Sequence, residues 1–156
     1  MNDYNRLKIT KIKRIDLETA KLAKEKGFDN LTDGVWANFD NPEGTGEKSL
    51  HTSEGYLSNR EFDKGLACTA PYQEELKKWL RDNHDLIVES TFATDLGRRL
   101  FERSHPDKES SNYKYTIIHV VDYEDEIFEH FADPDEMFDT YEDALEVGLQ
   151  RALKII

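Results

Sequence analysis

The 156-residue sequence has little cysteine, few basic residues and no long hydrophobic run, and each shortage excludes a class of protein. Its single cysteine, Cys68, rules out a disulfide-stapled scaffold and favours a cytoplasmic setting. No apolar run approaches the roughly 18–20 residues of a membrane span, so we expect no membrane segment. Basic residues number 21 against 33 acidic ones, and the resulting net charge of −12 argues against general nucleic-acid binding because it repels phosphate.

The composition that remains suits one folded, acidic domain. Aromatic residues make up 11% of the chain, which argues against disorder. The charge is uneven: residues 1–27 carry eight basic and four acidic side chains, whereas residues 122–156 carry two basic and twelve acidic ones. We therefore divide the chain into a basic N-terminal segment, 1–15, expected to be mobile, and a single domain over 16–156.

Two helices are predicted in the first half of the chain. Asp16 is a good N-cap, and Gly27 suits the left-handed position after a last turn, which together predict a helix over 17–26. A stripe of apolar residues at helical spacing predicts a second helix over 72–83. Pro71 is expected at its first position, where the missing N–H costs nothing.

A third helix is predicted over 140–154. Thr140 and Asp143 match a capping box, and apolar residues follow the 3.6-residue period to the end of the chain. This helix should bury one face against a sheet, and Gly148 on that face indicates a close approach to a neighbouring backbone. The residues expected in the core are Trp79, Leu80, Ile117, Leu145 and Leu149.

Runs of β-branched and aromatic residues between breakers predict strands at 35–39, 56–57, 66–69, 86–92 and 113–122. In the last of these, alternation places five residues on one face: Tyr113, Tyr115, Ile117, His119 and Val121. The segment Asp95–Arg103 fits a strand and a helix equally well. Helices interrupted by hairpins, with no repeated βαβ unit, predict an α+β domain with a mostly antiparallel sheet and three helices packed on one face.

Three blocks carry a resemblance: Glu18–Asp29, Ala70–Glu89 and Thr140–Ile156. Together they resemble a group of small uncharacterised proteins from phages, prophages and mobile elements of gut bacteria. In that group an Ala-Pro-Thr opening precedes a Trp-Leu-Arg-Glu helix, whereas here Tyr72 replaces the threonine and Asp82 the glutamate. The resemblance implies a fold and a mobile-element origin. It implies no activity and transfers no functional residue.

The sequence contains no motif for catalysis, a metal or a cofactor. Gly44–Ser49 lacks the adjacent Gly-Lys of a phosphate loop, and Asp29–Asp40 lacks the ligands of a calcium loop. None of the five histidines stands at metal-binding spacing. We expect no cofactor and lean against an enzyme. The alternative is a small enzyme, possibly metal-dependent, that uses carboxylates and His119.

The favoured hypothesis is an accessory protein that binds a basic protein partner through its acidic surface, because opposite charge steers encounter. A second alternative is an acidic DNA mimic that inhibits a host nucleic-acid enzyme. The oligomeric state is left open. The candidate partner-binding residues all lie in the acidic segment: Asp122, Glu124, Asp125, Glu126, Phe128, Glu129 and Phe131.

Overall fold

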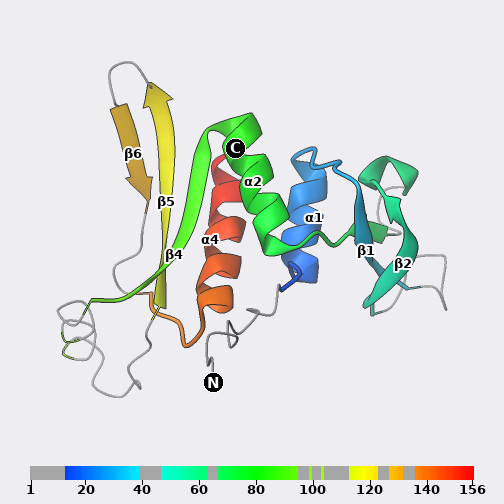
Figure 1. The fold of residues 1–156 in the computed structure, drawn as a ribbon, viewed down its shortest axis with the longest axis horizontal. Coiled ribbons are helices and arrows are strands. Elements are labelled where there is room, and N and C mark those ends of the chain that lie inside the picture. The colour runs from blue at the N-terminus through cyan, green and yellow to red at the C-terminus, as the bar shows by residue number, and fades with distance from the viewer. Residues whose placement is uncertain are drawn as a thin grey trace, which may run out of the picture.

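The computed structural model describes residues 13–38, 47–62, 67–94, 99, 103, 113–122, 127–131 and 136–156. Figure 1 shows the helices side by side, with strands on both sides of them. In chain order the elements are α1 (Leu17–Glu25), β1 (Thr32–Ala37), β2 (Ser49–Leu57), a 3-10 turn η1 (Asn59–Glu61), β3 (Ala67–Thr69), α2 (Gln73–His84), β4 (Leu86–Phe92), β5 (Tyr113–Asp122), β6 (Ile127–Phe131) and α4 (Tyr141–Ile155).

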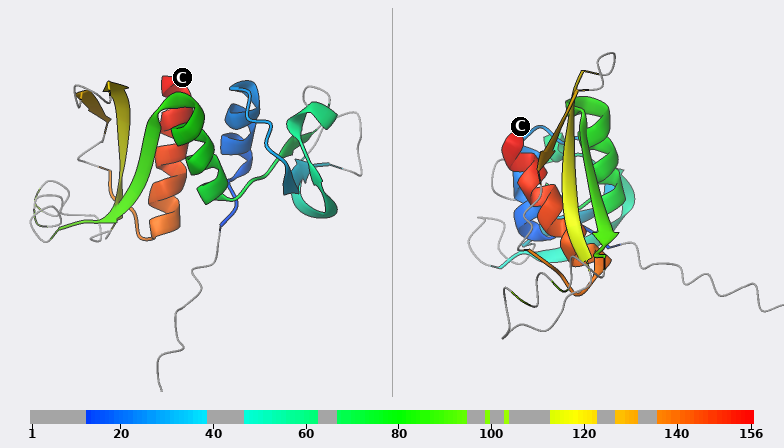
Figure 2. Two further views of the ribbon diagram at one scale, coloured as in Figure 1. Left: turned by 45° about the horizontal axis from the view of Figure 1, so that its top comes forward. Right: turned by 90° about the vertical axis from the view of Figure 1, so that its left-hand side faces the viewer.

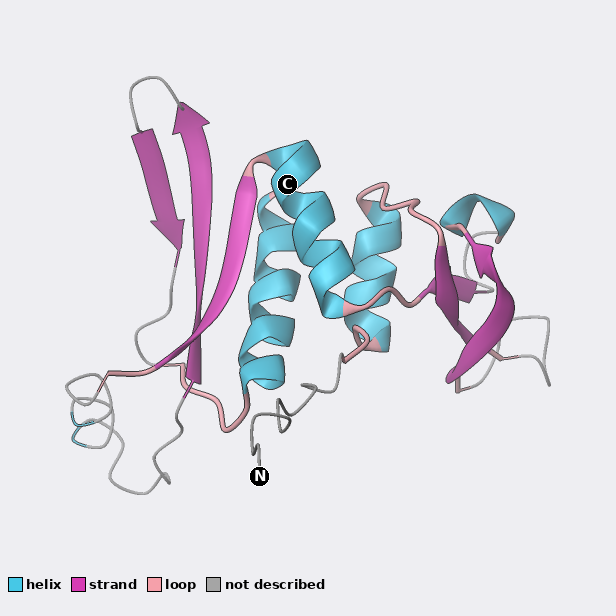
Figure 3. Cartoon of the chain, in the orientation of Figure 1, coloured by secondary structure: helices cyan, strands magenta, loops and turns pink. Residues whose placement is uncertain are grey.

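The described strands form two antiparallel sheets of three, ordered β2-β1-β3 and β4-β5-β6. α2 and α4 pack against one face of the second sheet, whereas α1 contacts α4 and β3. Figures 2 and 3 show the helices as a layer between the sheets. Within the described ranges, the predicted α+β class, antiparallel pairing and three helices are confirmed. The described strands are divided between two sheets, and α1 contacts the first of them through β3. None of the described helices is long and apolar enough to cross a membrane.

α1 is capped as its sequence predicts. The Asp16 side chain accepts a hydrogen bond from Thr19 N at 2.9 Å. Gly27 follows the helix with φ at 88°, a conformation that glycine adopts without strain. Phe28 is then 1% exposed and packs edge-on against Trp79, with the ring centroids 5.5 Å apart.

α2 begins later than predicted, and Pro71 is not its first residue. Tyr72 is the N-cap, and Glu75 Oε2 accepts from Tyr72 N at 2.8 Å. Pro71 precedes the helix, and its carbonyl accepts from Ile15 N at 3.1 Å, which joins the segment before α2 to the segment before α1. After α2, Asp85 adopts a left-handed conformation with φ at 54° and turns the chain directly into β4.

α4 occupies the centre of the domain. Thr140 Oγ1 accepts from Asp143 N at 3.1 Å, as the capping box predicts. A Cβ on Gly148 would lie 3.0 Å from side-chain atoms of both Val88 and Tyr115. The predicted close approach is therefore present, although side chains rather than backbone make it. The prediction that only one face is buried is wrong, since α4 also packs against α1 and α2.

The predicted core and most strands agree with the structure. All five predicted core residues are buried, with Trp79 the most exposed at 7%. β5 has the predicted bounds, but its register shifts between Val120 and Asp122. Val121, predicted to share a face with the buried Ile117, lies in this irregularity and is 52% exposed, whereas Val120, which is still in regular register, is 4% exposed.

Other parts of the chain differ in extent from the predictions. The strand expected at 56–57 is the end of the nine-residue β2. β6 was not predicted, because its sequence was interpreted only as an acidic stretch. Of Asp95–Arg103, the structure describes Arg99 and Arg103, and both are helical. Packing begins before residue 16, since Ile15 is fully buried.

Candidate functional site

The structure describes part of the predicted partner-binding segment, on β5 and β6. Glu129 and Phe131 lie on β6, two residues apart, and both are exposed. The backbone of Asp122 ends β5, and that of Phe128 pairs with Val120. Glu124, Asp125 and Glu126 lie outside the described residues, as do the side chains of Asp122 and Phe128. Of the seven candidates, the described side chains are therefore those of Glu129 and Phe131.

β6 is an edge strand. It pairs with β5 on one side, with Glu129 opposite His119 and Phe131 opposite Ile117, and no other described strand pairs with it. Figure 1 shows it at the side of the sheet farthest from α1. Phe131 is 37% exposed although Ile117, its cross-strand neighbour, is 1% exposed. The helix layer thus covers the centre of the sheet and leaves part of β6 open.

His119 and Glu129 form the described pair that the enzyme hypothesis would use. His119 Nδ1 lies 3.4 Å from Glu129 Oε2, and the His119 side chain is 36% exposed. His119 is therefore only partly buried, although its cross-strand neighbour on β4, Leu86, is fully buried. Within the described ranges, no three histidine, cysteine, aspartate or glutamate side chains are grouped to hold a metal ion.

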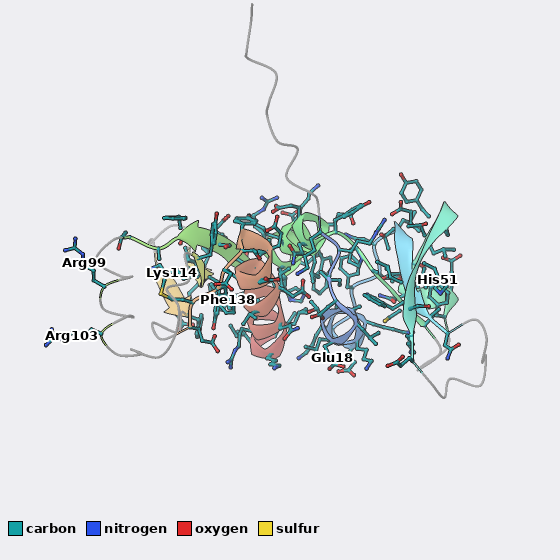
Figure 4. All side chains as sticks on the ribbon, turned by 90° about the horizontal axis from the view of Figure 1, so that it is seen from below. Glu18, His51, Arg99, Arg103, Lys114 and Phe138 are labelled. Atoms are coloured by element: carbon teal, nitrogen blue, oxygen red, sulfur yellow. The ribbon has the colours of Figure 1, made fainter. Side chains whose placement is uncertain are left out.

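Basic side chains lie at the end of the molecule that holds the β4-β5-β6 sheet. Arg99, Arg103 and Lys114 are exposed, and Figure 4 places them at the end opposite to His51 on β2. Arg98, Arg99 and Arg103 are close together in the sequence, and Arg98 lies outside the described residues. The structure places the two described arginines four residues apart in helical conformation and adds no ligand-binding geometry to them.

A second site, missed by the sequence analysis, lies where the three helices meet. Glu146 on α4 is 5% exposed. Its Oε1 accepts hydrogen bonds from Asp16 N at 2.9 Å and Thr19 Oγ1 at 2.5 Å, and its Oε2 accepts from Gln73 Nε2 at 2.6 Å. These donors come from the N-cap of α1, the first turn of α1 and the first residue of α2. One carboxyl group therefore joins all three helices.

Opposing effects act on the pKa of the Glu146 carboxyl group. Burial raises the pKa of its carboxyl group, and the neighbouring Asp16 carboxylate raises it further. Hydrogen bonds from Thr19, Gln73 and the Asp16 backbone lower this pKa, but burial is the largest effect. Lys13 also faces the cluster, and its Nζ lies 2.8 Å from Asp143 Oδ1. The arrangement holds a titratable group in the interior without a direct ion pair among the described contacts.

A sequence signal for Glu146 exists. It stands three residues before Leu149 and seven before Leu153, which is the spacing of one helical face. The expected buried face was defined by its apolar stripe alone, which does not include Glu146. Thr19 and Gln73 carry no comparable signal, because their burial depends on how α1 and α2 are placed around α4.

Comparisons of the chain with protein-family models, with curated proteins and with solved structures find no match.

Proposed function

We propose that the protein is a non-enzymatic accessory protein, of the phage or mobile-element type that its sequence resembles, and that it binds a basic protein partner along β6. The observation that carries this proposal is the position of β6 at the edge of its sheet, with Glu129 and Phe131 exposed on the strand. An edge strand can pair with an added strand through its outer row of backbone N–H and C=O groups.

The charge on β6 favours a basic partner over a second copy of the chain. Glu129 is the middle residue of the five-residue strand. If two copies of β6 paired along their whole length, Glu129 would therefore lie opposite itself. Like charges directly across a strand pair are destabilising, whereas a lysine or arginine in that place would be favourable. The net charge of −12 adds long-range attraction for a basic partner.

Phe131 supplies an apolar contact beside this charge. It is 37% exposed, so a partner side chain could cover it and remove its remaining surface from water. Aromatic residues that become buried in this way often contribute much of the energy of an interface. The proposed surface, which we call the β6 edge, therefore consists of the β6 backbone with Glu129 and Phe131.

A defined probe tests this proposal. A short synthetic peptide of alternating lysine and valine is titrated into isotope-labelled protein, and amide shifts are followed by NMR. We expect the largest shifts on β6 and its neighbour β5, and weaker binding at high salt, because surface charges are screened beyond about 8 Å at physiological ionic strength. Shifts centred on the other exposed strands, or binding that does not change with salt, would contradict the proposal.

Charge-reversal variants sharpen the test. Glu129→Lys should weaken peptide binding, because it places like charge on the β6 edge. Glu25→Lys is the matched control, since Glu25 is also exposed but lies at the end of α1, away from this sheet. Both variants change the net charge equally. Equal weakening by the two would show that only the overall charge matters and would overturn the assignment to β6.

A further inference from the structure

Two carboxyl groups approach the same hydroxyl in the Glu146 cluster. Thr19 Oγ1 lies 2.9 Å from Asp16 Oδ1 and 2.5 Å from Glu146 Oε1, both within hydrogen-bonding distance. A threonine hydroxyl carries one hydrogen and can donate it to only one of these oxygens. If both carboxyl groups were ionised, one of the two contacts would have oxygen lone pairs facing each other without a proton between them.

The surrounding donors do not supply the missing hydrogen. Asp16 N and Gln73 Nε2 donate directly to Glu146, and Thr19 N donates to Asp16. Gln150 Nε2 lies 3.3 Å and 3.4 Å from the two oxygens of Asp16. None of these groups lies between the Thr19 hydroxyl and the second carboxyl group.

We propose that Glu146 keeps a proton in the folded protein at pH values where exposed glutamates are ionised. This proton forms the hydrogen bond between Glu146 on α4 and Thr19 on α1. The Glu146 O–H then donates to Thr19 Oγ1, and the Thr19 O–H donates to Asp16 Oδ1. Every contact in this chain has one hydrogen, and the protonated oxygen can still accept from Asp16 N. When rising pH removes the proton, two negative carboxylates face one hydroxyl and the attachment of α1 weakens.

Glu146 is the better site for the proton than Asp16. Glu146 is 5% exposed, whereas Asp16 is only half-buried and caps α1, a position that favours a negative charge. Of the charged groups around Glu146, Asp16 favours the protonated form and Lys13 opposes it, with Asp143 engaging Lys13. From α2 the uncharged Gln73 faces the carboxyl group.

The sheet adds no charge to this balance. Gly148 lies two residues after Glu146 on α4, which is about 200° around the helix from it. Gly148 is on the side of α4 that packs on the sheet. The side chains that approach it there are Val88 from β4 and Tyr115 from β5. Among the described contacts of Glu146, none comes from a charged group of either strand.

A carboxyl titration of the wild-type protein gives the direct test. The side-chain carboxyl carbons are followed by NMR as pH rises from 4 to 9, with Glu142 as the internal reference. Glu142 lies one turn earlier on α4 and is half-exposed. We expect the titration midpoint of Glu146 to lie above that of Glu142. A midpoint at or below that of Glu142 would overturn the proposal, and this measurement needs no variant to fold.

The pH dependence of stability gives a second readout through Glu146→Gln. A carboxyl group whose pKa is higher in the folded state makes the folded protein less stable as pH rises from the unfolded-state pKa to the folded-state pKa. The unfolding constant of the wild type should therefore rise relative to that of the variant, approaching about tenfold per pH unit in that interval. The amide nitrogen cannot accept from Asp16 N, so a constant offset is also expected.

The trend with pH, and not the offset, decides the outcome. Glu142→Gln is the matched control on the same helix, and the trend for Glu146→Gln should exceed the trend for this variant. The ratio of the wild-type unfolding constant to that of Glu146→Gln decides the question. If this ratio stays constant with pH, or changes in the opposite direction, the buried group is ionised and the proposal is overturned. The result is independent of whether β6 binds a partner.

Discussion

Arg14 Nη2 lies 2.5 Å from Asp33 Oδ1, and this ion pair joins the segment before α1 to β1. The Arg14 side chain is 8% exposed. Its Nη1 also donates to Ala70 O at 2.7 Å, and its guanidinium carbon lies 4.0 Å from the centre of the Tyr72 ring. One planar group therefore connects three segments that are distant in sequence. Gly34 leaves the space for it, since a Cβ there would overlap both Arg14 and Ala70 O.

We expect Arg14→Lys to lower the free energy of unfolding by about 1–3 kcal/mol, because a lysine cannot reproduce the planar set of contacts and leaves buried acceptors unpaired. Arg151→Lys is the matched control: Arg151 is 52% exposed and pairs with Glu136 at 3.2 Å. That exposed pair should contribute less than about 0.5 kcal/mol. Urea denaturation measures both, and equal losses would contradict the role assigned to Arg14.

The same ion pair predicts sensitivity to acid. The hydrogen bond from Arg14 lowers the pKa of Asp33 below its ordinary value of 3.8. Stability from the ionised carboxylate is therefore present above that value and is lost as pH falls through the lower folded-state pKa. We expect the wild type to lose stability relative to Asp33→Asn by about 0.2–1 kcal/mol between pH 4 and 2, a small effect because the side chain is partly solvated. Denaturation at each pH measures the free energy of unfolding of both proteins. If it falls equally for the two between pH 4 and 2, this prediction is contradicted.

The helices could be predicted because the signals that define them are local. Asp16 and Thr140 cap helices through groups three residues away, and Gly27 ends α1 by its own conformation. Pro71 shows the limit of this reasoning. Its place before α2 depends on pairing with Ile15, 56 residues earlier in the chain, and a local pattern contains no information on that contact.

The parts of the candidate sites that were missed depend on tertiary neighbours. β6 is short and acidic, and it becomes a strand by pairing with the strongly predicted β5. Glu146 is buried because donors from α1 and α2 meet its carboxyl group, which compensates for the removal of a polar side chain from water. Sequence periodicity gives the direction in which a side chain points, but not which polar groups will meet it.

Gly148→Ala should destabilise the protein although alanine favours a helix by about 0.8–1.0 kcal/mol over glycine. The new Cβ would lie 3.0 Å from atoms of Val88 and Tyr115 in a closely packed region, and overpacking costs about 1–3 kcal/mol. The net loss expected is about 1 kcal/mol. Gly55→Ala is the control, because no atom lies within 4 Å of a Cβ there. A stabilised Gly148→Ala variant would mean that the sheet yields easily at this contact.

Leu149→Ala should lower the free energy of unfolding by about 2–5 kcal/mol, because Leu149 is fully buried in the core and the truncation leaves a cavity. Ile155→Ala, at the end of the same helix, removes a side chain that is 40% exposed and should cost far less. Chemical denaturation compares the two. A loss below about 0.5 kcal/mol for Leu149→Ala would mean that α4 is peripheral rather than central.

Cys68 should react slowly with thiol reagents. It is 2% exposed on β3, paired with Trp36 of β1, and burial raises the pKa of its thiol. The thiolate is the reactive form, and burial both disfavours it and keeps reagents away from it. Modification therefore requires β3 to open. We expect labelling by DTNB to be at least about a hundredfold slower than in Thr52→Cys/Cys68→Ala, which places a thiol at an exposed position of β2; this ratio corresponds to about 2.7 kcal/mol of opening free energy. Mild urea should speed the reaction of Cys68 and leave that of the exposed thiol unchanged. If both thiols react at the same rate in native buffer, β3 opens freely and Cys68 is not part of a stable core.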